Sequence, residues 1–132
     1  MSERVSVSID GGVADVRMNR PDKMNALDQA MFQGLVETAR ALGADGKVRA
    51  VVLSGEGRAF CAGLDFMSFM AMGNGERSGG PGLLSRSEDS PANFAQLAAY
   101  VWTSLPVPVI AAIHGVAFGG GLQIARSAPT SA

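Results

Sequence analysis

Two apolar segments of this chain end in the same way, and this shared ending constrains the fold more than any other feature. The first reads VVLSGEGRAFCAGLD from Val51, and the second reads VIAAIHGVAFGGGLQ from Val109. Each passes from an apolar run typical of a buried strand, through small residues, into the first turn of a predicted helix. Strand and helix thus alternate along the chain. This order favours an α/β fold with a parallel sheet and right-handed crossovers.

The other segments fit this arrangement. Alternating apolar residues on both sides of DGG at residues 10–12 predict a β-hairpin. An apolar stripe recurring every three or four positions predicts a helix over residues 26–42, ended by Gly43. We expect a mobile surface loop at residues 73–91, which are rich in Gly, Ser and charged side chains. The remaining predicted elements are strands at 48–54 and 107–115 and helices at 66–72, 91–104 and from 119 onward.

Composition narrows the classes of function. The chain has 132 residues, of which 47% are hydrophobic, and a net charge of −1, so it can form a core but has no basic surface for nucleic acid or anionic membranes. Its single cysteine excludes an internal disulfide and fits a reducing, cytoplasmic setting. No signal peptide and no membrane-spanning run is evident, and one His and one Cys far apart do not predict a metal site.

The two glycine-rich strand ends predict a ligand site. Ligands of parallel sheets bind beyond the carboxyl ends of the strands, where helices begin with unpaired N–H groups. Two such loops on neighbouring strands can direct two N–H donors at one oxygen, as in an oxyanion hole. A phosphate site is the weaker alternative, since the Lys-Ser/Thr of a P-loop is absent, and tight helix packing alone would also explain the glycines.

Three segments together resemble the crotonase, or enoyl-CoA hydratase/isomerase, family. They are NRPDKMNALD at residues 19–28, AFCAGLD at 59–65 and PVIAAIHGVAFGGGLQIA at 108–125. The resemblance implies an α/β fold, an incomplete crotonase-like ββα spiral. Residues 1–125 would be the N-terminal part of an acyl-CoA-binding domain, and residues 126–132 would be a tail outside the resemblance.

The resemblance also implies roles for particular residues. The thioester oxygen of an acyl-CoA would lie between the backbone N–H groups of Leu64 and Gly120, which stabilise the enolate. No separate cofactor is implied, because CoA is part of the substrate, and family members are usually trimers or hexamers. Residues expected to contact the substrate are Ala59, Phe60, Ala62, Asp65, Phe66, Met70 and Gly119, with Met67 and Phe69 as further candidates for an apolar pocket.

The sequence departs from the family at the catalytic acid. Gln123 stands where hydratases have a Glu, and an amide orients water but does not accept a proton at neutral pH. The family's second carboxylate lies further along than residue 132, so we expect a truncated chain whose reaction is undetermined. Two alternatives remain: a catalytically inactive fragment or pseudo-enzyme, and a thioesterase-type hydrolase using Cys61 and His114.

Overall fold

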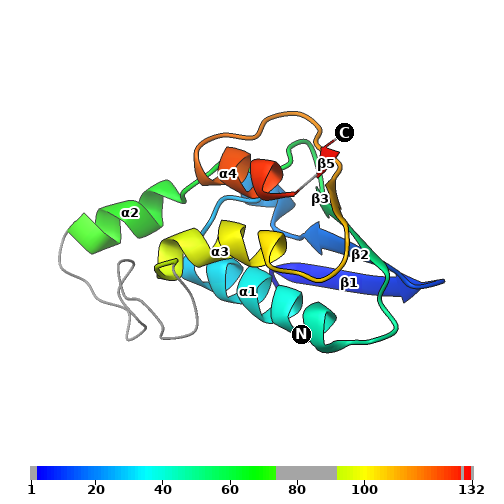
Figure 1. The fold of residues 1–132 in the computed structure, drawn as a ribbon. Coiled ribbons are helices and arrows are strands. Elements are labelled where there is room, and N and C mark those ends of the chain that lie inside the picture. Colours follow the sequence, from blue (N-terminus) through cyan, green and yellow to red (C-terminus); the bar gives the residue numbers. More distant parts are fainter. Residues whose placement is uncertain (1–2, 74–91, 129, 132) are drawn as a thin grey trace.

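A computed structural model describes residues 3–73, 92–128 and 130–131. Most of the expected mobile loop at residues 73–91 therefore lies outside the described residues. The described part folds into one mixed sheet with helices packed against it (Figure 1). Among these residues, no helix has both the length and the hydrophobicity of a membrane span.

The chain begins with the predicted hairpin. Strand β1 (Val5–Asp10) pairs antiparallel with β2 (Val13–Met18), and Asp10 lies opposite Val13. The two-residue turn between them has positive φ angles of 58° at Gly11 and 83° at Gly12. Such a turn matches the right-handed twist of the flanking strands, and glycine adopts it without steric cost.

The rest of the sheet is parallel, as the alternation of strands and helices predicts. Strand β3 (Ala50–Gly55) lies between β2 and β4 (Val109–Ala111), and β5 (Thr130–Ser131) completes the order β1-β2-β3-β4-β5. The pattern of residues 126–132 did not predict β5, because a two-residue strand is defined by its partner and not by a period of its own.

Three helices cover one face of the sheet. Helix α1 (Gln29–Ala44) packs against α3 (Phe94–Thr103), which packs against α4 (Gly120–Ser127), and Figure 1 shows them stacked in that order beside the strands. The predicted apolar stripe is buried in this layer. A fourth helix, α2 (Phe66–Gly73), projects beyond the other three. The apolar stripe predicted over residues 26–42, which is buried against the other helices and the sheet, comprises Leu27, Met31, Leu35, Ala39 and Leu42.

The predicted helix end at Gly43 is wrong. Helix α1 continues to Ala44, and its C-cap residue Asp45 donates its N–H to the carbonyl of Leu42. A Cβ atom at Gly43 would lie 2.9 Å from Cδ2 of Leu105. The glycine therefore makes room for the segment that joins α3 to β4, and the helix passes through it.

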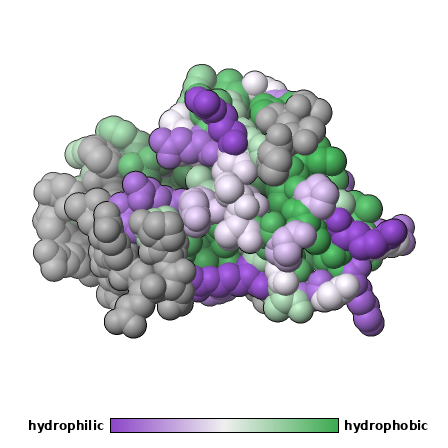
Figure 2. Space-filling view, in the orientation of Figure 1, coloured by the Kyte–Doolittle hydropathy of each residue, from purple (hydrophilic) through white to green (hydrophobic). Residues whose placement is uncertain are grey.

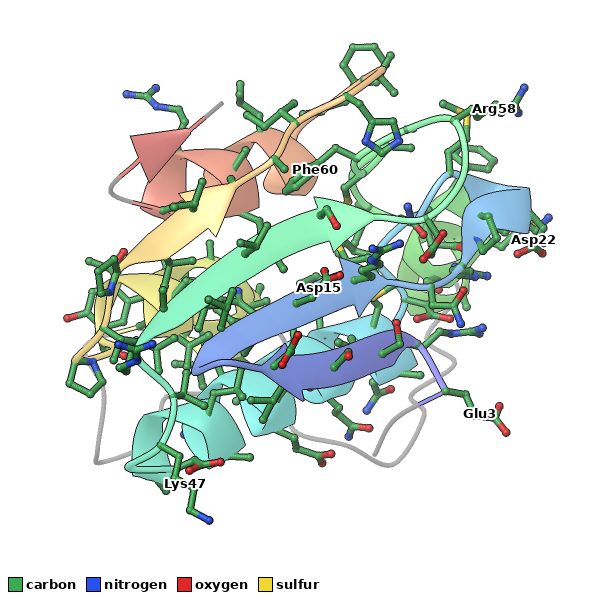
Figure 3. All side chains as sticks on the ribbon, turned by 90° about the vertical axis from the view of Figure 1, so that its right-hand side faces the viewer. Glu3, Asp15, Asp22, Lys47, Arg58 and Phe60 are labelled. Carbon is green, nitrogen blue, oxygen red and sulfur yellow. The ribbon has the colours of Figure 1, made fainter. Side chains whose placement is uncertain are left out.

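One face of the sheet is covered by helices and the other is not. Figure 2, in the orientation of Figure 1, shows hydrophobic surface interspersed with hydrophilic side chains. Figure 3 shows the face of the sheet that the helices leave uncovered, with the helices behind the strands. On that face Arg17 forms ion pairs with Asp15 at 2.8 Å and with Glu56 at 3.0 Å.

Candidate active site

The candidate site lies at one edge of the sheet. Strands β2, β3 and β4 are parallel, so the loops at residues 19–28, 56–65 and 112–119 all leave from their carboxyl ends. Figure 3 shows Asp22 and Arg58, from two of these loops, at the same end of the molecule. This edge is where ligands bind in open parallel sheets.

The loop at residues 56–65 is the middle one of the three, and the others hold it by backbone hydrogen bonds. On one side Cys61 pairs with Ala117: the N–H of Cys61 donates to Val116 across 3.1 Å, and that of Phe118 donates to Cys61 across 3.0 Å. On the other side Leu27 pairs with Leu64 in a second parallel bridge. The three loops therefore form a continuation of the sheet beyond its strands.

The Leu27 bridge determines the direction of the Leu64 N–H. The carbonyl of Gly63 accepts a hydrogen bond of 2.7 Å from the N–H of Leu27. The Gly63–Leu64 peptide is trans, so its N–H points away from Leu27. Among the described residues, this N–H donates to no other group. Gly63 has a φ of 92°, and a Cβ there would lie 2.7 Å from the carbonyl oxygen of Phe118, so only glycine fits.

The N–H of Gly120 is the second donor. Gly119 precedes α4 with a φ of 50°, and its carbonyl accepts the N–H of Gln123 at 3.1 Å. Helix α4 thus begins at Gly120, whose N–H has no acceptor among the described residues. The first N–H groups of a helix also carry its partial positive charge.

Leu64 and Gly120 line the same cavity, which has a volume of about 160 Å³. Gln123 lines it as well, whereas the remaining wall is almost wholly apolar. No Asp, Glu, His, Lys or Arg is among the described residues of the wall. The arrangement offers a largely apolar cavity whose lining includes the two residues with the backbone donors and two side-chain amides, those of Gln96 and Gln123. The other lining residues are Leu27, Phe32, Ala95, Gln96, Ala98, Ala99 and Ile124.

Two polar residues of the loop at residues 19–28 hold the site together, and the sequence did not predict their roles. Asn25 is fully buried, and its side-chain nitrogen donates to the carbonyl oxygens of Glu56, Ala59 and Phe60 at 3.0, 2.9 and 3.2 Å. Nη1 of Arg20 lies 2.6 Å from Oδ2 of Asp65. Both residues stand in the segment that carries the family resemblance, which was the one available signal.

Asp65 is a structural carboxylate. It caps α2 by accepting the N–H of Ser68 at 3.0 Å, and it pairs with Arg20. Burial raises the pKa of Asp65, but the backbone N–H of Ser68, the Arg20 guanidinium and the N–H of Met67 together hold it below its usual range. Its oxygens are thus engaged by the protein, and the carboxylate is ionised at neutral pH.

Cys61 and His114 are held by different groups. Sγ of Cys61 donates to the carbonyl of Asn25 at 3.1 Å, and burial raises the pKa of this thiol. Nε2 of His114 lies 2.7 Å from the carbonyl oxygen of Gly57. No hydrogen bond joins the two side chains in the described part of the chain, so a nucleophile–base pair is not formed here.

The other residues expected to contact substrate fall into two groups. The side chains of Ala59 and Phe60 are fully buried, and Figure 3 places Phe60 inside the molecule. Their side chains are therefore not accessible in this structure, and contact with the substrate stays a prediction for their backbone. Phe66 and Met70 are exposed on α2 and do not line the cavity. Ala62 is half-buried and donates its N–H to the carbonyl of Met24 at 2.9 Å. Gly119 is exposed just before α4, and Met67 is exposed on α2.

Comparisons with known proteins define the class. A family model described as enoyl-CoA hydratase/isomerase matches residues 8–129. The chain is 35% identical to the mitochondrial Delta(3,5)-Delta(2,4)-dienoyl-CoA isomerase of Mus musculus, in an alignment 122 residues long that covers 85% of this chain. A solved enoyl-CoA hydratase/isomerase family member is 32% identical with a TM-score of 0.78, and the enoyl-CoA hydratase of Bacillus anthracis is 25% identical with a TM-score of 0.76. The chain belongs to the enoyl-CoA hydratase/isomerase family, and its expected crotonase-like α/β fold is confirmed.

The match covers part of each relative. Each of the two solved structures matches 97% of this chain, but only 46% of its own length is covered. The chain spans 34% of the mouse isomerase.

Proposed function

We propose that the residues lining this cavity bind an acyl-CoA thioester, and that its enolate is stabilised between the N–H groups of Leu64 and Gly120. The observation that carries the proposal is that both N–H groups lack an acceptor among the described residues, and that Leu64 and Gly120, which bear them, line one largely apolar cavity. Donors held in place before the reaction stabilise the charge that develops on the thioester oxygen. One such donor contributes about 3 kcal/mol to catalysis.

Gln123 limits the chemistry assigned to this cavity. Its amide can hydrogen-bond to a water molecule or to the acyl group, but it does not take up a proton at neutral pH. Binding and enolate stabilisation are therefore the proposed contribution of these residues, and hydration or isomerisation needs a proton-transferring group in addition. A binding protein without turnover is the second candidate, and the uncharged cavity wall favours it.

Acetoacetyl-CoA tests the proposal directly, because its enolate absorbs in the ultraviolet where the keto form does not. We expect the enolate absorbance to rise at pH 7 when the 132-residue chain is added. Leu64→Pro removes the N–H and should lower the enolate-binding constant by roughly 100-fold, whereas Leu64→Ala keeps the donor and should retain most of the signal. An absorbance that does not change with the wild-type chain would refute enolate stabilisation.

Turnover separates the two candidates. If the chain hydrates or isomerises an enoyl-CoA, it is an enzyme by itself, and if it binds acetoacetyl-CoA as enolate without turnover, it is a binder. Release of free CoA from a saturated acyl-CoA would favour the hydrolase with Cys61 instead.

A further inference from the structure

We infer that Arg20 is a positioning residue for the Leu64 N–H donor. Its guanidinium contacts residues on both sides of the Leu27–Leu64 bridge and so braces the bridge, and the bridge sets the direction of the N–H. The inference rests on the proposed function of that donor. It concerns a side chain that does not line the cavity and so acts only through other residues.

The guanidinium of Arg20 contacts residues of both segments of the bridge, a backbone carbonyl and a carboxylate on the Leu27 side and a carboxylate on the Leu64 side. On the Leu27 side, Nη1 donates to the carbonyl of Ala26 at 3.2 Å and lies 3.4 Å from Oδ2 of Asp28. On the Leu64 side, the same nitrogen lies 2.6 Å from Oδ2 of Asp65. Arg20 thus holds together the residues that flank each member of the pair.

The braced residues control the donor peptide. The N–H of Leu27 donates to Gly63, and the N–H of Asp65 donates to Leu27 at 3.0 Å. The first holds the carbonyl of the Gly63–Leu64 peptide, and the second holds the N–H of the next peptide, Leu64–Asp65, so sliding between the segments would turn the donor. An oxyanion donor has to be directed to within tenths of an ångström to be effective.

The geometry suits an arginine. Asp28 caps α1 by accepting the N–H of Met31, and Asp65 caps α2, so Arg20 links two capping carboxylates. The side chains of Arg20, Asp28 and Asp65 are 13, 15 and 9% exposed, which places the charges where water screens them weakly. The backbone of Arg20 is itself held, since its N–H donates to Oδ1 of Asn25 at 2.8 Å.

Hydrogen exchange of the 132-residue chain tests the bracing without any ligand. In Arg20→Lys, which keeps the charge, and in Asp65→Asn, which keeps an acceptor for the α2 cap, the amides of Leu27 and Asp65 should exchange roughly 10-fold faster relative to a β3 amide. The control is Arg17→Gln, an exposed ion-paired arginine on the far face of the sheet, which should leave both amides unchanged. Unchanged exchange in both Arg20→Lys and Asp65→Asn overturns the inference.

Binding of acetoacetyl-CoA then tests whether the contacts of Arg20 affect the Leu64 N–H donor. Both variants should reduce the fraction of bound ligand present as enolate several-fold, with a much smaller change in affinity for a saturated acyl-CoA that forms no enolate. Arg20→Gln should reduce the fraction further than Arg20→Lys. An undiminished fraction despite faster exchange also overturns the inference, with the proposed function intact. No enolate signal from the wild-type chain refutes the proposed function itself, and the role assigned to Arg20 with it.

Discussion

The side-chain nitrogen of Asn25 lies 2.9 Å from the carbonyl oxygen of Ala59, 34 residues further along the chain. This contact and its neighbours join the loop after β2 to the loop after β3 in the fully buried centre of the site. Buried carbonyl groups without partners are costly, so an amide that serves three of them is hard to replace.

Asn25→Asp should lower the free energy of unfolding by about 3 kcal/mol, because a carboxylate oxygen would replace the donor that faces the carbonyls of Glu56, Ala59 and Phe60. Urea unfolding measures the difference. The matched control is Asn93→Asp, since Asn93 caps α3 by accepting the N–H of Gln96 and aspartate caps equally well. Equal losses in the two variants would show that the amide donor of Asn25 is not what matters.

Gly121→Ala should destabilise the chain by roughly 2–3 kcal/mol. A Cβ at Gly121 would lie 2.7 Å from Cβ of Cys61 and would also meet the Cys61 carbonyl, and this is where α4 crosses the middle loop. Gly46→Ala adds the same atom where nothing lies within 4 Å and should change stability by less than about 0.5 kcal/mol. Thermal unfolding distinguishes them, and a tolerant Gly121 would contradict the close packing.

Asp65 should make stability depend on pH in the acid range. Its pKa in the folded chain lies below the unfolded value of 3.8, so its contribution is complete above that pH and is lost as the pH falls through the lower, folded pKa. The difference in unfolding free energy between the wild type and Asp65→Asn should therefore shrink below about pH 4. Urea titrations between pH 7 and 2.5 measure it.

The control repeats the pH titration in an Arg20→Gln background, where the unfolding free energies of the chains with and without Asp65→Asn are compared again. Arg20 is one cause of the lowered pKa of Asp65, so its loss should move the window towards the ordinary value of an aspartate. A difference that grows as the pH falls would contradict the sign of the shift.

The Cys61 thiol should react slowly in the folded chain. It is buried, its Sγ donates to Asn25, and burial raises the pKa of the thiol. We expect labelling by an aromatic disulfide at pH 8 to be at least roughly 100-fold slower in buffer than in urea. We also expect Cys61→Ala to bind acyl-CoA as the wild type does. Fast labelling that abolishes thioester cleavage would favour the hydrolase instead.

Local patterns predicted most of the elements. The hairpin and the Asp65 cap follow from interactions within a few residues, which a single stretch of sequence contains. The parallel order of β3 and β4 follows from the alternation of strands and helices along the chain. The predicted helix end at Gly43 was wrong because glycine occurs both where helices end and where another segment packs closely against a helix. Here the residue that packs against Gly43 is Leu105, which is far along the chain. The interactions of Arg20 and Asn25 were not predictable for the same reason.

The sequence by itself determined the α/β order, because strand and helix periodicity are local properties of the chain. Its resemblance to a known family indicated the family and gave Leu64 and Gly120 as the candidate donors. The tertiary structure decided that the Leu64 N–H points away from Leu27 and is braced from behind, that Phe60 is buried, and that Cys61 and His114 are occupied separately. Those outcomes depend on hydrogen bonds between three loops that meet only when parallel strands place their carboxyl ends at one edge.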